Sequence, residues 1–386
     1  MTTSEVELSK VIHVHYGSAL KEAERDQSGA HEVFGSSGFV GHHSANLFDY
    51  PSIVIGRKGS VGSVTYAPNG GWAIDTAFFV ELLTPKTTDL RYLFYALKNA
   101  QLAKYTITTS IPGLSRNDIY RTRIFLPDIE EQRRIADILD KADAIRRKRK
   151  EAIALTEELL RSAFLEMFGD PVTNPMGWPT ASLGDEAEQM KYGTSEKCDA
   201  NEKIGTPVLR IPNVVGGQVD WNDLKYAALS EKETRDLRLR AGDVLFVRSN
   251  GNPAYIARCA VVSDSDERRG ALFASYLIRV RLQSGRLSPT YVAAALSAES
   301  YRARLTSEAR TTAGNYNIST EGLRRLIVPA APITRQTQFA RLVESTRAAI
   351  ARDGRAFVQA EDLFNSLVAR AFSGAMNRAP TETTDA

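Results

Sequence analysis

The sequence has no long apolar run and very few cysteines. No stretch approaches the roughly eighteen apolar residues that a membrane-spanning helix needs, and the polar start, residues 1–5, has no signal-peptide pattern. The two cysteines, Cys198 and Cys259, offer neither a metal-ligand spacing nor a disulfide framework. We therefore expect a cytoplasmic protein that does not associate with a membrane.

The sequence also lacks a strong charge surplus and a motif for a cofactor. A net charge of +3 over 386 residues does not by itself indicate nucleic acid. No glycine-rich loop follows an early strand in the pattern that holds S-adenosylmethionine. No cysteine or carboxylate cluster accompanies the histidines, so we expect no metal, no cofactor and no catalytic Ser/His/Asp group. The five histidines are His13, His15, His31, His42 and His43.

What the chain does have is an internal repeat. Residues 109–170 align with residues 313–374 without a gap, at a constant shift of 204. Identity is low, but the apolar positions agree at a helical interval, which is what two copies of one fold require. The matching pairs include Leu114-Ser115 with Ile318-Ser319, Gln132 with Gln336, and Leu159 with Leu363.

Each copy runs from a short apolar strand through a proline into a long amphipathic segment. The strands span residues 124–127 and 326–329, and the segments run from about residue 129 to 168 and from about 333 to 372. Neither segment has an internal proline, and Gly169-Asp170-Pro171 ends the first. As helices these segments would each measure roughly 60 Å. A helix of that length with one apolar stripe needs a partner, and we expect the other copy to provide it.

Upstream of each long segment lies a region of short strand-like runs and turns, followed by a shorter helix. These runs span residues 52–55 and 77–80 in the first region and 243–247 and 275–280 in the second. The shorter helices are expected at about 90–104 and 290–305. The fold class is therefore α+β, with two mixed α/β domains joined by two long helices in a pseudo-repeat.

Two segments carry a family resemblance. Phe125-Leu126-Pro127-Asp128-Ile129-Glu130-Glu131-Gln132 and Trp178-Pro179-Thr180-Ala181-Ser182-Leu183-Gly184-Asp185 resemble the start of the long helix and the start of a recognition domain in specificity subunits of type I restriction-modification enzymes. The resemblance extends to about residue 376. There are two departures. Pro332-Ile333-Thr334-Arg335-Gln336 keeps only the glutamine and the apolar pattern, and the first domain lacks the Trp-Pro opening, beginning near Val6-Glu7-Leu8.

The resemblance implies a non-catalytic subunit in which each of two target-recognition domains reads one half of a split site in double-stranded DNA. The long helices would pack antiparallel, like a coiled coil, fix the spacing and dock two methyltransferase subunits. ATP-driven restriction/translocase subunits would complete the complex. The expected parts are the first recognition domain (1–128), a central spacer helix (129–170), the second recognition domain (171–328), a C-terminal spacer helix (329–376) and a flexible tail (377–386).

The tetrapeptide Asn252-Pro253-Ala254-Tyr255 favours a different class. It differs by one residue from the Asn-Pro-Pro-Tyr loop with which amino-methyltransferases bind a flipped adenine, so an adenine-methyltransferase-like enzyme is one alternative. The missing cofactor loop argues against it, as does the matching position of the turn Gly59-Ser60-Val61-Gly62 in the first domain. A purely structural helical scaffold is another alternative, and a related system that combines methylation and cleavage differently is a third.

Two basic segments each have a structural and a DNA-binding interpretation. The segment 56–62 contains Arg57 and Lys58 but lacks the Gly-Lys-Ser/Thr ending of a phosphate loop. It is either an ordinary turn between strands or a turn whose amides and Lys58 contact DNA phosphate. The run Arg146-Arg147-Lys148-Arg149-Lys150 is either a solvated helix face balanced by acidic neighbours or a patch that attracts DNA.

Base-reading side chains should be Arg, Lys, Asn, Gln, Ser or Thr at loop tips, because these carry the donors and acceptors that complement base edges. Two loops in each domain have this chemistry. The DNA-binding residues that we predict are Arg57, Lys58, Ser60, Thr109, Ser110, Arg116 and Asn117 in the first domain, and Arg248, Ser249, Asn250, Asn252, Thr312, Asn315 and Asn317 in the second.

Overall fold

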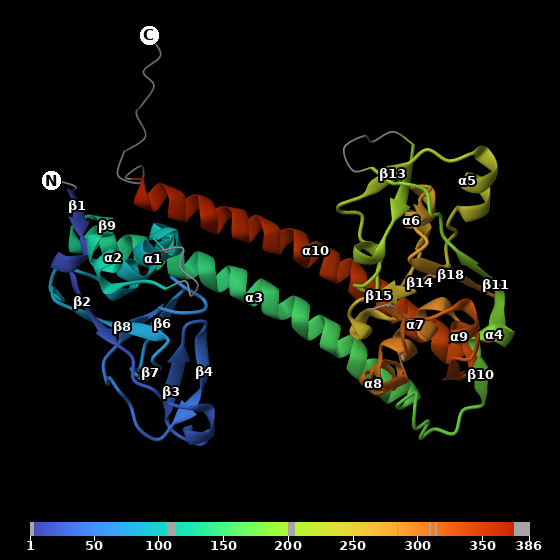
Figure 1. Ribbon diagram of the computed structural model, residues 1–386, viewed down its shortest axis with the longest axis horizontal. Helices are drawn as coiled ribbons and strands as arrows, with labels where there is room; N and C mark the ends of the chain where they lie inside the picture. The colour runs from blue at the N-terminus through green and yellow to red at the C-terminus, as the bar shows by residue number, and fades with distance from the viewer. Residues whose placement is uncertain are drawn as a thin grey trace, which may run out of the picture. The chain divides into compact units, whose positions relative to one another are not determined.

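The computed structural model describes residues 4–105, 113–199, 205–283, 285–308, 310–312 and 315–373, and the expected tail at 377–386 lies outside them. The chain divides into two compact units, Met1–Glu151 with Gly354–Ala386, and Ala152–Asp353. Two long helices, α3 (Ile129–Phe168) and α10 (Ile333–Phe372), each contribute one part to each unit. Both helices extend over the residues that the sequence periodicity predicts (Figure 1).

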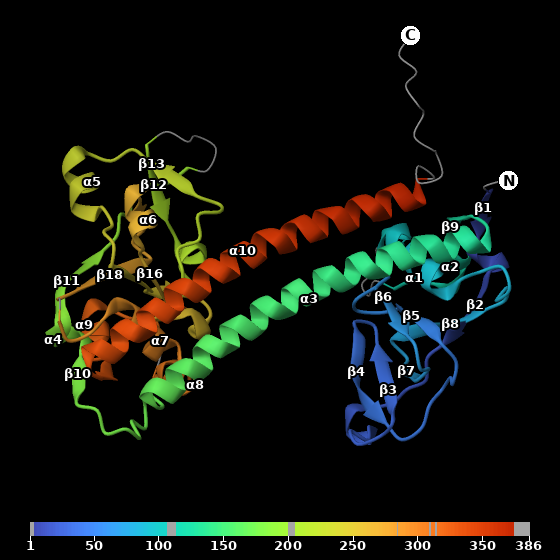
Figure 2. The same cartoon turned by 180° about the vertical axis from the view of Figure 1, so that it is seen from behind.

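The first unit contains a four-stranded antiparallel sheet of order β2-β8-β5-β6, a three-stranded sheet of order β4-β3-β7, and the pair β1-β9. Within this unit, α1 and α2 lie at one end of the four-stranded sheet and β3, β4 and β7 lie at the other, in both views (Figures 1 and 2). The strands are β1 (Ser4–Glu7), β2 (Ile12–Tyr16), β3 (His31–Gly35), β4 (Gly38–His43), β5 (Ser52–Gly56), β6 (Val64–Ala67), β7 (Trp72–Ala73), β8 (Ala77–Leu82) and β9 (Arg123–Leu126), and the helices are α1 (Leu90–Ala100) and α2 (Arg116–Arg121).

The second unit contains a four-stranded antiparallel sheet of order β11-β18-β14-β16, a three-stranded sheet of order β13-β12-β17, the pair β10-β21, and a small additional sheet of order β15-β20-β19. The strands are β10 (Thr180–Ser182), β11 (Ala187–Tyr192), β12 (Thr206–Leu209), β13 (Lys225–Ala227), β14 (Val244–Val247), β15 (Ser249–Asn250), β16 (Cys259–Val261), β17 (Leu272–Phe273), β18 (Leu277–Leu282), β19 (Arg310–Thr312), β20 (Asn315–Asn317) and β21 (Ile327–Pro329). The helices are α4 (Leu183–Glu186), α5 (Glu231–Leu237), α6 (Asp264–Arg268), α7 (Pro289–Ser297), α8 (Glu299–Glu308) and α9 (Thr320–Arg324).

The two units agree sheet by sheet in strand order and strand direction. In both three-stranded sheets, the middle strand pairs antiparallel with one neighbour and parallel with the other. The α+β fold and the pseudo-repeat expected from the sequence are therefore confirmed. The likeness also covers the domains upstream of the aligned residues, where the two sequences have diverged.

The first domain opens with the same strand as the second, although it lacks the Trp-Pro motif. β1 pairs antiparallel with β9, and β10 pairs antiparallel with β21. The Leu8 N–H then donates to Thr122 O at 3.0 Å, and the Leu183 N–H donates to Leu326 O at 2.9 Å. Both leucine side chains are fully buried. Backbone pairing and one buried leucine are thus what this position requires, and both sequences meet that requirement.

Within each unit, a segment of α3 packs against a segment of α10. In the first unit, Arg146 lies 3.6 Å from Glu361. In the second, the Phe164 and Phe339 ring centres are 5.5 Å apart, and Arg335 donates to Met167 O at 3.3 Å. In this second unit, later residues of one helix thus meet earlier residues of the other, which is antiparallel packing.

A fully buried glutamine connects α3 to the first domain. Gln132 Oε1 accepts a hydrogen bond from the Asp89 N–H at 2.9 Å, and Gln132 Nε2 donates to Thr87 O and Pro127 O at 2.9 and 2.7 Å. Asp89 also caps α1, since its side chain accepts from the Tyr92 N–H. The start of the long helix is thereby fixed to the start of a helix of the domain.

Gln336 forms the same connection in the second unit. Its Oε1 accepts from the Ser288 N–H at 2.8 Å, and its Nε2 donates to Arg286 O and Ala331 O at 2.9 and 2.7 Å. Ser288 caps α7 as Asp89 caps α1. The sequence repeat aligns these two glutamines, and their common role explains why a polar residue occupies a buried position.

The shorter helix of the first domain ends before the sequence predicts. The expected helix spanned residues 90–104, but α1 ends at Ala100 because Gln101 adopts a left-handed backbone conformation with φ of 50°. A 3-10 turn, η3 (Leu102–Tyr105), follows. No glycine or proline marks this end, so the apolar periodicity of the sequence predicted a longer helix.

The corresponding helix of the second domain is broken in two. One helix was expected over residues 290–305, but α7 ends at Ser297 and α8 begins at Glu299. Ala298 between them has a ψ of 143°, which is incompatible with a continuous helix. Here too, no glycine or proline marks the interruption between α7 and α8.

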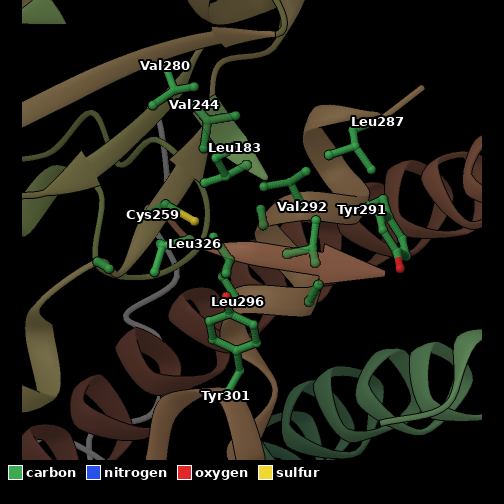
Figure 3. Close-up of a cluster of buried hydrophobic side chains, with 14 of the residues drawn as sticks. Leu183, Val244, Cys259, Val280, Leu287, Tyr291, Val292, Leu296, Tyr301 and Leu326 are labelled. Atoms are coloured by element: carbon green, nitrogen blue, oxygen red, sulfur yellow. The ribbon is translucent and has the colours of Figure 1, made fainter. Parts of the chain in front are cut away.

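Each domain has its own apolar core between the four-stranded sheet and its helices. Figure 3 shows the core of the second domain, where Val244, Cys259 and Val280 of the sheet lie near Val292 of α7. Burial raises the pKa of the Cys259 thiol to about 12, so this cysteine stays protonated near neutral pH and packs as a small apolar group.

Candidate nucleic-acid interface

In the first domain, the two loops predicted to bind DNA lie side by side. The turn that follows β5 and the segment that precedes α2 are joined by backbone contacts. Lys58 forms an antiparallel bridge with Gly113, and the Leu114 N–H donates to Arg57 O at 3.0 Å. The turn itself links the antiparallel strands β5 and β6. Residues far apart in the sequence therefore form one polar surface.

The same pairing occurs in the second domain. β15 pairs antiparallel with β20, with Ser249 opposite Asn317, and the Ile318 N–H donates to Arg248 O at 2.9 Å. Asn317 and Ile318 are the residues that the shift of 204 matches to the pairing residues of the first domain. The two loops thus meet through equivalent backbone positions in both domains.

The sequence prediction missed an aromatic residue beside each pair of loops. Tyr16 ends β2 and Tyr192 ends β11, and a glycine follows each, Gly17 and Gly193. A Cβ atom on either glycine would lie 2.1 Å from a backbone carbonyl oxygen, so only glycine allows this close approach. The signal was present in the sequence, as a Tyr-Gly dipeptide followed by Ser or Thr in both copies.

Two arginines surround Tyr16 in the first domain. The guanidinium carbon of Arg57 lies 5.0 Å from the ring centre, and that of Arg116 lies 4.4 Å from it. Arg116 is held there because α2 begins at this residue, with the Ser115 side chain accepting a hydrogen bond from the Asp118 N–H at 3.2 Å. A partly exposed ring with two cations beside it offers a planar, positively charged surface.

Tyr192 has a related environment in the second domain. The guanidinium carbon of Arg248 lies 4.7 Å from its ring centre, and the Thr320 N–H donates to its hydroxyl oxygen at 3.1 Å. Burial alone would raise the pKa of Tyr192, but the hydrogen bonds from Thr320 and the positive charge of Arg248 together hold this pKa below its usual value. Thr320 takes the place that Arg116 has in the repeat.

Asn250 and Asn252 use their side-chain oxygens to shape their own loop. Asn250 Oδ1 accepts from the Asn252 N–H at 2.8 Å, and Asn252 Oδ1 accepts from the Ala254 N–H at 2.9 Å. The second bond caps the 3-10 helix η5 (Pro253–Tyr255). The tetrapeptide therefore forms a turn between β14 and β16, and the Nδ2 groups are the donors that these two residues can offer to a base.

The other predicted DNA-binding residues are placed as follows. Lys58, Ser60 and Asn117 are exposed. Thr109 and Ser110 lie outside the described residues, and Thr312 and Asn315 are described by their backbone, in β19 and β20.

The basic run on α3 divides between packing and exposure. Arg146 lies 2.7 Å from Asp143 and its guanidinium carbon lies 5.0 Å from the ring centre of Phe364 on α10, so it belongs to the contact between the helices. Arg147 pairs with Asp143 at 2.9 Å. Lys148 and Lys150 are exposed. The expectation of a solvated face is therefore wrong for Arg146, which is amphipathic enough to cover an aromatic ring.

Four of the five histidines, His13, His15, His42 and His43, make local aromatic contacts. His15 Nε2 lies 2.9 Å from Glu81, and its ring stacks on Phe79 with 4.8 Å between ring centres. Among the described residues, no group of three or more His, Cys, Asp and Glu is arranged to hold a metal ion. In the same part of the chain, no helix combines the length and the apolar character that crossing a membrane requires.

The sequence is similar to specificity proteins of type I restriction-modification systems. Residues 2–155 match the model of a family described as type I restriction modification DNA specificity domain. The EcoKI specificity subunit of Escherichia coli strain K12 is 31% identical over 191 residues, which are 48% of this chain and 40% of that protein. The EcoprrI specificity subunit of Escherichia coli is 29% identical over 141 residues, 36% of this chain and 35% of the relative. The chain thus matches less than half the length of these two curated relatives.

A solved structure agrees over a larger part of the chain. The S subunit of a type I restriction-modification system from M. genitalium has a TM-score of 0.63 to this chain, with 96% of each chain covered and 15% sequence identity. At that identity the likeness concerns the fold of two sheet-rich domains joined by long helices. Residues 2–155, which are less than half of the chain, thus resemble type I restriction-modification specificity domains in sequence, and most of the chain resembles a solved S subunit in fold.

Proposed function

We propose that this chain reads a bipartite site in double-stranded DNA, one half with each domain, as the non-catalytic specificity subunit of a type I restriction-modification complex. One observation carries the proposal. In both domains the same two loops, joined through equivalent backbone positions, place polar residues beside an exposed tyrosine and an arginine. Aromatic, guanidinium and amide groups on paired loops suit DNA contacts. The names of the relatives support the same role.

The partners that we propose are two methyltransferase subunits bound to the helices. Leu159 and Leu363 are matched by the repeat, and both side chains are more than half exposed, at 58% and 54%. Exposed leucines at equivalent helical positions suit two copies of one partner, because each copy then meets the same surface. The restriction/translocase subunits of the proposal rest on the family resemblance alone.

Changing the leucines one at a time tests the two docking surfaces. In Leu159→Asp or Leu363→Asp, one methyltransferase copy should be lost, because each change buries a charge in one interface. In the double variant, both copies should be lost. Native mass spectrometry of the purified complex measures this stoichiometry. Retention of both copies in the double variant would contradict docking at these leucines.

We place catalysis in the partner rather than in this chain. Asn252 and Tyr255 are the residues that a methyltransferase loop would need, but Asn252 Oδ1 is bound to its own loop, and the guanidinium carbon of Arg258 lies 5.5 Å from the Tyr255 ring centre. The bond at Asn252 occupies the oxygen that would accept from an adenine amino group, which disfavours a catalytic role for this loop.

The test of the proposed function uses a random double-stranded DNA library and a labelled methyl donor. The chain in complex with its methyltransferase subunits should methylate adenine within one split sequence, whereas the chain alone should transfer no methyl group. Methyl transfer by the chain alone would favour the enzyme alternative. Binding without any sequence preference, alone and in the complex, would favour the scaffold alternative.

A further inference from the structure

A tyrosine and an arginine form the same pair in both domains. Tyr16 and Arg57 come from the ends of β2 and β5, and Tyr192 and Arg248 come from the ends of the equivalent strands β11 and β14. The distances from guanidinium carbon to ring centre are 5.0 and 4.7 Å. Both rings are partly exposed, at 48% and 37%. An arginine over a tyrosine that water still reaches is a surface feature and not a part of the core.

Each arginine is held by the same two bonds. In the first domain, the Arg57 N–H donates to Thr76 O at 2.9 Å, and Arg57 Nη1 donates to Asp75 O at 3.3 Å. Both acceptors lie just before the central strand β8. These bonds hold the guanidinium group near the ring and still leave several of its N–H groups for a ligand.

In the second domain, the Arg248 N–H donates to Tyr276 O at 2.9 Å, and Arg248 Nη1 donates to Ser275 O at 3.4 Å. These acceptors lie just before β18, which is the equivalent central strand. The arrangement therefore repeats in backbone bond, side-chain bond and aromatic support.

The residues around these arginines do not repeat. Lys58 of the first domain corresponds to Ser249 of the second through their pairing partners, and Arg116 corresponds to Thr320 at the shift of 204. Two domains that read different half-sites must differ in the residues that contact bases. What they share should contact what all DNA shares, which is the sugar-phosphate backbone.

We propose that Arg57 and Arg248, each supported by its tyrosine, bind a DNA phosphate at equivalent places in the two half-sites and set the register of each domain, while their non-repeated neighbours read bases. The inference rests on the proposed function, because it requires both domains to bind DNA. A planar guanidinium suits this role, since it can bind phosphate through two parallel N–H groups. Stacking on the ring removes side-chain freedom that binding would otherwise cost.

The test compares Arg57→Gln and Arg248→Gln in the complex with its methyltransferase subunits. Each variant should bind the selected site and a scrambled site about tenfold more weakly, as expected for one lost charged contact. The slope of log affinity against log salt concentration should fall in magnitude by about one. The sequence selected from a random library should stay the same. The matched controls, Arg123→Gln and Arg268→Gln, change exposed arginines away from the loops and should leave all three measurements unchanged.

The tyrosine variants distinguish the contribution of the aromatic ring from the contribution of the arginine charge. Tyr16→Leu and Tyr192→Leu keep the arginine but remove the ring, so affinity should fall by a smaller factor and the salt slope should stay the same. Lysine at either arginine position should restore the slope but only part of the affinity, because an ammonium group cannot form the bidentate contact.

The outcomes distinguish the inference from the proposed function. Relaxed preference at one base of one half-site in Arg57→Gln or Arg248→Gln would overturn the phosphate assignment and make these residues base readers. Unchanged affinity and slope, in a complex that still selects a split site, would overturn the inference and leave the proposed function standing. A wild-type complex without any sequence preference would overturn both.

Discussion

The first and second domains use the same buried hydrogen bonds to hold different surface residues. Gln132 and Gln336 make matching sets of three bonds. Tyr92 donates to Phe125 O in β9 and Tyr291 donates to Pro329 O in β21, the strands that precede the two long helices. The loops beside Tyr16 and Tyr192 share backbone pairing but few side chains. The comparison teaches that buried polar groups specify how each domain joins its long helix, whereas the side chains on the paired loops are free to differ between the domains.

One buried position of the four-stranded sheet carries a different residue, with different polar contacts, in each domain. Ser52 and Asp243 are equivalent by strand register and both are completely buried. The Ser52 hydroxyl donates to Val80 O, which is a neutral contact. Asp243 instead accepts two hydrogen bonds from Arg281, both at 2.7 Å. At this position the second domain therefore relies on an ion pair with a fully buried carboxylate, where the first domain has a neutral contact.

Breaking this ion pair should give the largest effect. Asp243→Asn should lower the free energy of unfolding of the second domain by about 3–5 kcal/mol, because it removes the counter-charge of Arg281 and of the fully buried Arg279, which lies 4.0 Å away. The matched Ser52→Ala should cost the first domain only about 1 kcal/mol. Hydrogen exchange read by mass spectrometry resolves the two domains. Equal losses would contradict the difference that the structure shows.

The buried glutamines should give the next largest effect, and an equal one in both domains. Gln132→Leu and Gln336→Leu each leave one N–H and two carbonyl groups without their partner, which should cost roughly 2–4 kcal/mol. Urea unfolding of the two variants checks the magnitude, and hydrogen exchange shows which domain is affected. A large loss for one variant and none for the other would mean that the two connections are not equivalent.

Raising the pH should weaken both domains through buried tyrosines, among them one at a matching position in each domain. Burial raises the pKa of Tyr92 and of Tyr291 above the usual value of 10.0. Above about pH 10 the unfolded chain loses these protons while the folded chain keeps them, so each tyrosine lowers the free energy of unfolding by about 1.4 kcal/mol per pH unit. Their contribution is fully present below about pH 10 and is lost as the pH rises further.

Phenylalanine at either position removes the part of this pH dependence that the tyrosine contributes. Tyr92→Phe and Tyr291→Phe should each flatten the alkaline part of a stability profile measured by urea unfolding, although each loses one hydrogen bond. The exposed Tyr276 supplies the control, since Tyr276→Phe should leave the slope as it is. A slope that is unchanged in both buried variants would place the alkaline loss elsewhere.

The smallest effect is expected at a glycine within α10. Gly354 lies inside the helix, and a Cβ atom there would meet no atom within 4 Å. Gly354→Ala should therefore raise the free energy of unfolding by about 0.5–1 kcal/mol, because alanine loses less backbone freedom in a helix. Thermal unfolding measures the gain. A destabilised variant would show that this position needs the small residue.

The two long helices and the alignment of Gln132 with Gln336 could be predicted from the sequence. They follow from the apolar periodicity and from the prolines that precede each long helix. The ends of α1 and α7 were not predictable, since Gln101 and Ala298 take non-helical conformations and no glycine or proline marks these positions. The pairing of the two loops also escaped, because it joins segments that are far apart in the sequence. Gly17 and Gly193 were visible but had no meaning until the close approach of a carbonyl oxygen was seen.

We propose that the two domains read two half-sites and that the two long helices set the gap between these half-sites. Four residues inserted between Glu151 and Ala152, and four more between Asp353 and Gly354, lengthen both helices by roughly 6 Å. The insertions fall between the helix contacts within the first unit, such as Arg146 with Glu361, and those within the second, such as Phe164 with Phe339, so both sets are kept.

Sequencing the DNA methylated by this variant, in complex with its methyltransferase subunits, measures the gap between the half-sites. Since B-DNA rises about 3.4 Å per base pair, the gap should grow by one or two base pairs. The bases of each half-site should stay the same, because neither pair of loops has changed. An unchanged gap with full activity would contradict the role of the helices, and changed half-site bases would contradict the assignment of reading to the two domains.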